Sequence, residues 1–130
     1  ELSIPGAVKL GDNWIFEIQP VNLTEQVYQS SLNNENLFQA WVSLDNIVHP
    51  LIIKTRSPGD RITPIGLPMG TMKLSDLMIN EKIPARVRSR WPILYTGEEV
   101  LWVPGMKLNH SYRISRETKT VARIRLWKET

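Results

Sequence analysis

The chain has 130 residues, a length that suits one or two small domains with a substantial buried core. Hydrophobic residues make up 42% and charged residues 22%, which excludes a wholly disordered chain. The lack of cysteine excludes disulfides, thiolate nucleophiles and cysteine–zinc sites. No stretch approaches the roughly 18 consecutive apolar residues of a membrane span, so we expect no membrane partner. Because the first residue is Glu1, we expect a piece of a longer protein.

Charge is distributed unevenly along the chain. Residues 1–50 carry one basic side chain against six acidic ones, a net charge of −5, whereas residues 51–130 carry 15 basic against seven acidic ones, a net charge of +8. Every arginine follows position 55, and guanidinium groups suit bidentate contact with phosphate. A basic half of this kind is typical of a polyanion-binding surface, and a solvated positive face is the alternative.

The first half of the chain predicts short strands. A period-two pattern indicates a strand over 14–18, with Trp14, Phe16 and Ile18 on one face, and a second strand is expected over 40–44. The polar stretch 19–38 is predicted to be a long loop. Residues 51–56 predict a third strand, which runs into a type II turn at Pro58 and Gly59.

The second half predicts two short helices between strands. Leu74, Leu77 and Met78 are spaced i, i+3 and i+4, which predicts an amphipathic helix over 73–82. Pro84 suits the first turn of a second helix, which ends before Pro92. Further strands are expected over 93–95 and 100–103, and strict alternation predicts a last strand over 121–128, with 122, 124 and 126 on one face. About seven strands around a short helical pair favour a sheet-dominated α+β fold.

Side chains suited to catalysis are sparse. His49 and His110 are far apart in the sequence, and each is interpreted as structural or on the surface. Asp60 and Asp76 could form an acid–base pair, but capping of the turn and of a helix start is the favoured interpretation. The loop 66–73 lacks the residue spacing of a P-loop. Its backbone amides could still bind a phosphate, and the alternative is a loop whose role is only to reverse the chain direction.

The strongest local signal is a cluster of cations in the middle of the chain. Arg86 and Arg90 are four positions apart and are predicted to lie on one face of the second helix, with Arg88 beside them. Like charges at this spacing on a helix repel one another unless an anion meets them. The candidates for RNA contact, all within 35 residues, are Arg56, Arg61, Lys73, Arg86, Arg88 and Arg90. Arg123, Arg125 and Trp127, on the polar face of the last predicted strand, are further candidates, with Trp127 available for base stacking. Arg56 could instead pair with Asp60 across the turn.

Residues 51–105 resemble a known family. The segment 51–61, which contains Arg56, Pro58, Gly59, Asp60 and Arg61, is similar to a strand and turn in the C-terminal domain of bacterial tRNA(Ile)-lysidine synthetases. The similarity continues through 64–66, 73–77, 83–84, Arg88 and 92–94, and it closes at 101–105. Residues 2–6 also resemble the start of that domain.

This resemblance implies a compact β-rich α+β fold with sandwich-like sheets, similar to a domain of the phenylalanyl-tRNA synthetase β subunit. It implies an acidic strand-and-loop lead-in, residues 1–50, packed with the same domain as a basic core, residues 51–130. The family's cytoplasmic enzyme uses ATP and lysine to convert the wobble cytidine of tRNA(Ile) to lysidine. That ligase chemistry, with ATP and Mg²⁺, belongs to an N-terminal adenylating domain with an S-G-G-x-D-S loop, a motif that this sequence lacks.

We therefore expect a non-catalytic role for this chain, without a cofactor or metal. In this role the chain binds the acceptor stem of tRNA(Ile) and contacts the N-terminal domain of its parent enzyme. One alternative is a scaffold module that packs on the catalytic domain and never touches RNA. In that case an acidic protein surface would meet the basic face. An independent small enzyme is disfavoured, because the sequence offers no evident nucleophile, metal-ligand set or phosphate loop.

Overall fold

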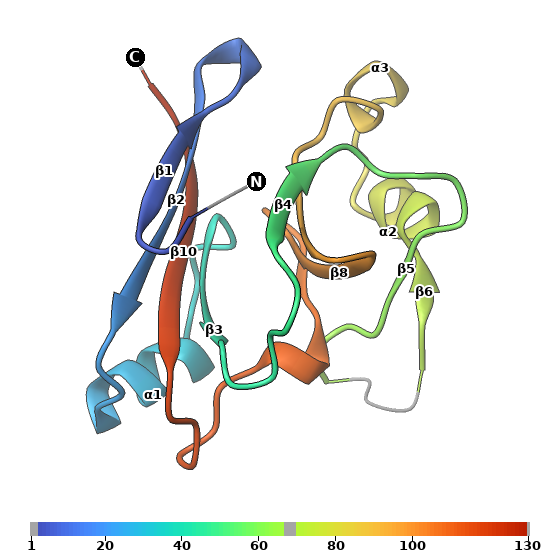
Figure 1. Cartoon of the computed structure of the whole chain (residues 1–130). Helices are drawn as coiled ribbons and strands as arrows, with labels where there is room; N and C mark the ends of the chain where they lie inside the picture. Colours follow the sequence, from blue (N-terminus) through green and yellow to red (C-terminus); the bar gives the residue numbers. More distant parts are fainter. Residues whose placement is uncertain (1–2, 67–69, 130) are drawn as a thin grey trace.

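Two four-stranded antiparallel sheets face each other in the computed structural model, which describes residues 3–66 and 70–129 (Figure 1). Sheet one has the order β1-β2-β10-β3, with bounds β1 Gly6–Lys9, β2 Trp14–Val21, β3 Gln39–Ser43 and β10 Val121–Lys128. Sheet two has the order β4-β7-β8-β9, with bounds β4 Leu51–Lys54, β7 Ile93–Thr96, β8 Glu99–Val103 and β9 Lys107–Leu108. The prediction of a strand-rich α+β domain with sandwich-like sheets is confirmed.

A smaller third layer lies on the side of sheet two that faces away from sheet one (Figure 1). It consists of a two-stranded ribbon, β5 (Arg61–Ile62) and β6 (Met72–Lys73), followed by α2 (Leu74–Asn80) and α3 (Ala85–Arg88). The remaining elements are α1 (Glu25–Leu32) and the 3-10 helices η1 (Gly11–Asn13) and η2 (His110–Tyr112). Among the described residues, no helix has the length and apolar character needed to cross a membrane.

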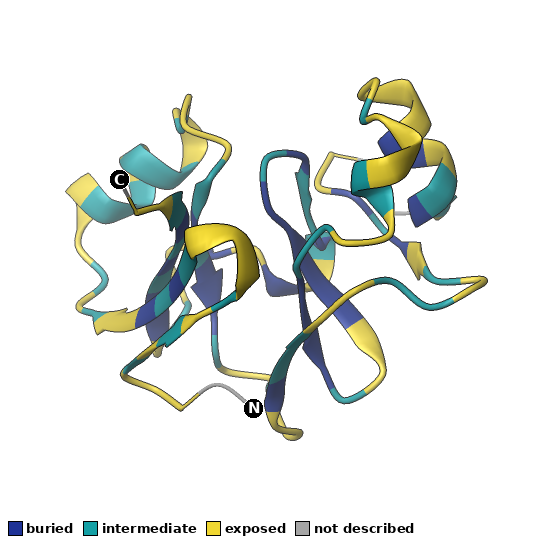
Figure 2. Ribbon diagram, turned by 90° about the horizontal axis from the view of Figure 1, so that it is seen from above, coloured by how far each residue is buried: buried dark blue, intermediate teal, exposed yellow. Residues whose placement is uncertain are grey.

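The first core lies between the two sheets. Phe16 and Ile18 of β2 and Ile124 and Leu126 of β10 are buried, and they pack in one cluster with side chains of sheet two. The Phe16 ring meets Trp102 of β8 edge-on, with ring centroids 5.6 Å apart. The faces predicted for the strands over 14–18 and 121–128 are therefore confirmed. Figure 2 shows the same arrangement, with buried residues on the facing strands and exposed residues on α3 and the loops.

Sheet two is buried on both faces, as expected of a central layer. In β7, Leu94 packs into the first core, whereas Ile93 and Tyr95 pack into a second core beneath the third layer. The pairing of β7 with β8 shifts register beside Leu94, and the consecutive residues Leu101 and Trp102 both reach the first core.

Helix α2 covers the second core. Leu74, Leu77 and Met78 are almost completely buried in it, as their spacing predicts. The inner side of the ribbon adds Ile62 and Met72 to the same cluster. The ribbon and helix are thus fixed to sheet two by apolar packing.

Two parts of the chain differ from the sequence-based expectation. The prediction of a loop over 19–38 is wrong, because β2 continues to Val21 and α1 follows it. Thr24 caps this helix by accepting a hydrogen bond from the Val27 N–H at 3.1 Å, and Glu25 favours its first turn. No residue of α1 is fully buried, so the helix lacks the apolar stripe by which sequence reveals helices.

The second difference concerns α3, which spans only Ala85–Arg88 rather than the whole stretch from Pro84 to Trp91. Ser89 is its C-cap. Trp91, restricted by the following proline, leaves the helical path, and its indole N–H donates to the Pro104 carbonyl at 2.9 Å.

Candidate nucleic-acid interface

The β5–β6 ribbon presents two cations side by side. Arg61 and Lys73 are direct cross-strand partners, next to the pair of Ile62 and Met72. Since neighbouring residues of a strand point to opposite faces, the apolar pair faces the core and the cationic pair faces solvent. Both cations are exposed. Like charges directly opposite each other destabilise a ribbon, unless an anion bridges them.

Arg61 is held in place by a neutral group. Its Nε donates to the Thr71 hydroxyl at 2.9 Å, and Nη2 donates to the Thr71 carbonyl at 3.4 Å. No carboxylate of the described residues forms an ion pair with Arg61 or Lys73. The guanidinium is therefore oriented without being neutralised. Sequence reasoning missed Thr71, because nothing in the sequence indicates that it lies beside Arg61.

Arg56 follows β4 and is half-buried. Arg56 and Asp60, both in the described part of the chain, do not form an ion pair. The Asp60 carboxylate instead accepts hydrogen bonds from the Ser57 N–H at 2.8 Å and from the Tyr95 hydroxyl, so the predicted role of Asp60 in the turn is confirmed. Burial, the hydrogen bond to Asp60 and the charge of Asp60 all raise the pKa of Tyr95. Arg56 Nε is buried, with no hydrogen-bond partner among the described residues.

The three arginines around α3 do not share one helical face. Arg86 is exposed and Arg88 is half-buried, and both lie in the last turn of α3, where cations are favourable. Arg90 lies beyond the end of the helix, which corrects the prediction that it aligns with Arg86. Its Nη1 is 3.8 Å from a carboxylate oxygen of Asp12 in η1, and both side chains are more than 60% exposed. An exposed pair at this distance contributes little stability.

The remaining predicted contacts, Arg123, Arg125 and Trp127, lie on a different side of the molecule. They are on the outer face of sheet one, because their neighbours in β10 point into the first core. Arg125 pairs with Glu17 at 2.6 Å and lies over the Trp127 ring, 4.7 Å from its centroid. The hydrogen bond from Arg125 lowers the pKa of Glu17. The ribbon and α3 lie at the two ends of the third layer, with α2 between them (Figure 1), whereas Arg123, Arg125 and Trp127 lie on the far side of sheet one.

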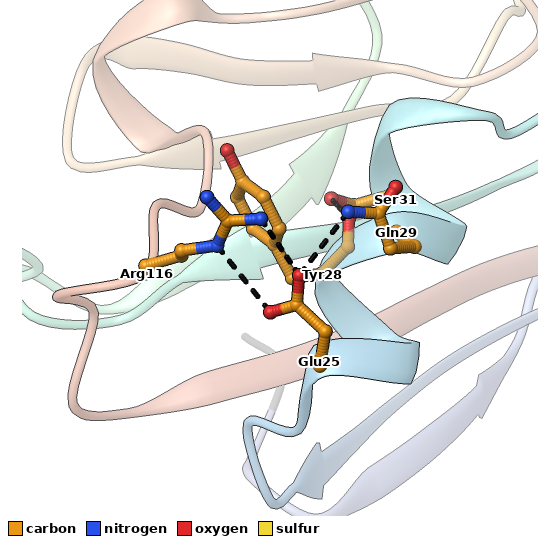
Figure 3. Close-up of polar contacts among 5 residues, drawn as sticks. All are labelled: Glu25, Tyr28, Gln29, Ser31 and Arg116. Carbon is orange, nitrogen blue, oxygen red and sulfur yellow. Dashed lines mark hydrogen bonds and ion pairs between the residues drawn. The ribbon is translucent and has the colours of Figure 1, made fainter.

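Two of the cations outside the predicted set, Lys54 and Arg116, contact aromatic rings. Lys54 of β4 lies over the Tyr95 ring, with Nζ 4.5 Å from the centroid, near the second core rather than on the sheet-one face. Arg116 makes a bidentate contact with Glu25 of α1, at 2.7 and 3.3 Å, and lies over the Tyr28 ring (Figure 3). Arg116 is thus neutralised within the chain.

The other residues singled out from the sequence have structural surroundings. Asp76 lies in the first turn of α2, as predicted. His49 is exposed, and its carbonyl accepts a hydrogen bond from the Thr96 hydroxyl at 3.2 Å. His110 is half-buried in η2. The phosphate-loop interpretation of residues 66–73 depends on 67–69, which lie outside the described residues.

Together these features define a class of protein: a two-sheet α+β domain that carries an exposed cationic ribbon and helix end on its outer layer. Exposed basic surfaces are a common feature of nucleic-acid-binding proteins. The chain belongs to the family described as "TilS substrate C-terminal domain", which matches residues 51–126.

Individual relatives agree with this assignment. A tRNA(Ile)-lysidine synthase of Symbiobacterium thermophilum is 35% identical over 86 residues, covering 66% of this chain and 18% of the relative. One of Caldanaerobacter subterraneus subsp. tengcongensis is 30% identical over 128 residues, covering 98% of this chain and 26% of the relative. The chain thus spans about a quarter or less of the length of these relatives.

Solved structures share the fold. The chain is similar to the "Crystal structure of TILS C-terminal domain", with a TM-score of 0.84, 25% identity and coverage of 100% of this chain and 95% of that one. An N-terminal fragment of the phenylalanyl-tRNA synthetase β subunit from Pyrococcus horikoshii has a TM-score of 0.58 at 18% identity, covering 87% of this chain and 38% of that one. The latter similarity concerns the fold alone, as the sequence resemblance implied.

Proposed function

We propose that this chain is the tRNA-docking C-terminal domain of a cytoplasmic tRNA(Ile)-lysidine synthase. In this role it binds the acceptor stem of tRNA(Ile), while another part of the parent enzyme uses ATP and lysine to modify the wobble cytidine. The chain contributes binding and no covalent step, and it holds no cofactor. The observation that carries the proposal is the exposed cross-strand pair of Arg61 and Lys73, which no described carboxylate neutralises.

The ribbon forms the centre of the proposed contact surface. Thr71 already orients the Arg61 guanidinium. Binding of a phosphate oxygen to its free N–H groups therefore costs little further side-chain entropy. Lys73, on the same face, adds a second positive charge to the same anion or to the next phosphate along the strand. An anion at this position also removes the repulsion between the two cations.

Helix α3, which carries Arg86 and Arg88, follows α2 in the third layer (Figure 1) and extends the proposed surface. Arg56 and Arg90, which follow β4 and α3 in the chain, are further candidates for this proposed surface. This arrangement suits a double-stranded RNA stem, because a protein reads A-form RNA through its phosphates, its ribose 2′-hydroxyls and its shape. Arg123, Arg125 and Trp127 face the opposite way and form no part of this proposed contact.

Steady-state kinetics of the full-length enzyme test the proposed division of labour. Replacing Arg61 and Lys73 with glutamine removes binding charge far from the proposed reaction centre. The KM for tRNA(Ile) should therefore rise, while kcat at saturating tRNA and the KM values for ATP and lysine should stay unchanged. A fall in kcat with an unchanged KM for tRNA would refute the docking role, because it would place these residues in the chemistry rather than in binding.

The alternative of a module that only packs on its parent enzyme makes a different prediction. Under that alternative, the purified chain would not bind tRNA(Ile), and the glutamine variants would weaken the contact between domains rather than the affinity for tRNA. Titration of the purified chain with tRNA(Ile) separates the two functions.

A further inference from the structure

The guanidinium group of Arg61 has two edges that can each hold an acceptor with two N–H groups. The side edge consists of Nε–H and one Nη2–H, and the outer edge consists of the other Nη2–H and one Nη1–H. Nε donates to the Thr71 hydroxyl at 2.9 Å and Nη2 donates to the Thr71 carbonyl at 3.4 Å. The side edge is therefore occupied within the chain, whereas Nη1 forms no hydrogen bond with any described residue.

The register of the β5–β6 ribbon explains this contact. Arg61 is directly opposite Lys73, and Thr71 comes two residues before Lys73, which makes it the diagonal neighbour of Arg61. Diagonal neighbours on one face of a strand pair lie within reach of long side chains. Arg61 and Thr71 are both exposed. The Arg61 side chain therefore extends diagonally across the solvent-facing side of the ribbon.

Two other arginines in the described part of the chain use the same edge with a different kind of partner. Nε and Nη2 of Arg116 donate to Glu25 at 3.3 and 2.7 Å (Figure 3). Nε and Nη2 of Arg125 donate to Glu17 at 3.0 and 2.6 Å. In both contacts a carboxylate orients the guanidinium and also cancels its charge. The partner of Arg61 is uncharged, so this arginine is oriented and keeps its full positive charge.

We propose that Thr71 is a positioning residue of the RNA-binding surface, and that it makes Arg61 bind phosphate through the outer edge of its guanidinium. Two oxygens of one phosphate accept hydrogen bonds from Nη1–H and Nη2–H, while Nε–H stays on the Thr71 hydroxyl. Thr71 acts through Arg61 and does not itself contact the RNA. The inference rests on the proposed function, because it specifies how Arg61 binds the phosphate there.

The contact with Thr71 contributes to affinity by ordering Arg61 before the RNA arrives. Fixing a long side chain at an interface reduces affinity by roughly two- to tenfold. Since the Thr71 hydroxyl already restricts the guanidinium, removal of that hydroxyl should weaken RNA binding by a factor in this range. The electrostatic part of the affinity should stay the same, because no charge is removed.

Titration of the chain with tRNA(Ile) across a salt series tests this role. The chain is suitable by itself, because the solved C-terminal domain to which it is similar is a chain of which the match covers 95%. Thr71→Val removes the hydroxyl and retains a β-branched side chain, which suits a position beside a strand. It should bind roughly two- to tenfold more weakly, with an unchanged slope of log affinity against log salt concentration. Thr71→Ser retains the hydroxyl and should restore the affinity of the unsubstituted chain.

A double-mutant cycle separates positioning from direct contact. Arg61→Lys retains the positive charge but lacks Nε–H and the two edges of the guanidinium. In the Arg61→Lys background, Thr71→Val should therefore have no further effect on affinity. An equal loss in both backgrounds would show that Thr71 contacts the RNA directly and would overturn the proposal. Unchanged affinity of Thr71→Val in the native background would overturn it as well.

NMR signals of the arginine side-chain N–H groups test which edge binds the phosphate. On addition of an RNA hairpin that reproduces the acceptor stem, the Nη–H signals of Arg61 should shift and exchange more slowly with water, while its Nε–H signal stays in place. The signals of Arg116 should not change, because Glu25 already occupies the corresponding edge. An Arg61 Nε–H signal that shifts as far as the Nη–H signals would show that phosphate displaces Thr71, which contradicts the proposal. This measurement uses the unsubstituted chain, so it decides even if Thr71→Val fails to fold.

The failure of this inference is distinguishable from the failure of the proposed function. If the glutamine variant of Arg61 and Lys73 loses affinity for tRNA(Ile) and Thr71→Val does not, the ribbon binds RNA without a positioning role for Thr71. If the glutamine variant binds tRNA(Ile) as tightly as the unsubstituted chain, the docking function of the ribbon is itself refuted.

Discussion

Replacing Lys73 with glutamine tests whether the ribbon keeps its cations for binding rather than for stability. Lys73 is directly opposite Arg61, and like charges at such positions destabilise a strand pair by roughly 0.2–1 kcal/mol. Removing one charge should therefore raise the free energy of unfolding, by about 0.5 kcal/mol. For a domain of this size that corresponds to a rise of about 2 °C in Tm.

Replacing Lys73 and Arg61 together with glutamine should weaken tRNA binding. Each phosphate contact contributes roughly 0.9 to the slope of log affinity against log salt concentration. Two contacts therefore raise the affinity by about 30-fold when the salt concentration falls from about 1 M to about 0.15 M. The double glutamine variant should bind tRNA(Ile) about 30-fold more weakly at about 0.15 M salt, and its slope should be smaller by about 1.8.

Fluorescence anisotropy titrations across a salt series measure the binding, and urea unfolding of the same samples measures stability. The control variant, Lys119→Gln with Lys128→Gln, removes two exposed cations from the sheet-one side of the molecule. It should lose little affinity. Equal losses in the control and the ribbon variant would refute a localised contact. A lower free energy of unfolding for Lys73→Gln would refute the argument from like-charge repulsion.

Four further outcomes are expected. Arg88→Gln with Arg90→Gln should weaken tRNA binding in the same titration with little change in Tm, since the contact of Arg90 with Asp12 is long and exposed; unchanged affinity at low salt would remove α3 from the interface. Residues 51–130 alone should show no cooperative unfolding by circular dichroism, because β10 loses both neighbouring strands; a sharp transition would show that sheet two suffices. Gly105→Ala should lower the free energy of unfolding by about 1–3 kcal/mol, since Gly105 has a φ of +78° and a Cβ would lie 2.8 Å from the Phe38 ring; an unchanged urea midpoint would contradict this. Burial, the hydrogen bond to Glu99 and the charge of Glu99 raise the pKa of Tyr112 to about 12. Above about pH 10 the unfolded chain therefore loses the phenolic proton before the folded chain does, and the free energy of unfolding falls until about pH 12. Tyr112→Phe should flatten this fall, and an identical pH profile would exclude Tyr112 as a cause.

Elements with a regular apolar pattern could be predicted from the sequence. The alternation in β2 and β10 correctly identifies the buried faces, and the spacing of Leu74, Leu77 and Met78 correctly identifies α2. Helix α1 could not be found in this way, because none of its residues is fully buried. The only local signal is its N-terminus, where Thr24 and Glu25 form a favourable cap and first turn.

The candidate site depended on long-range pairing that sequence spacing does not reveal. Arg61 and Lys73 were both identified as candidates, but only the register of β5 with β6 places them opposite each other. Sequence spacing likewise could not show that Arg125 meets Glu17, 108 positions away. That contact follows from the insertion of β10 between β2 and β3, which also turns Arg123 and Trp127 away from the ribbon.

Chemical-shift mapping of the chain with an RNA hairpin that reproduces the acceptor stem of tRNA(Ile) tests the central claim most directly. We expect the backbone amides of 61, 71–73 and 86–88 to shift on titration, with those of 123–127 unchanged. Shifts confined to β10, or no saturable shifts at low salt, would contradict the assignment of the outer layer of sheet two as the RNA-binding surface.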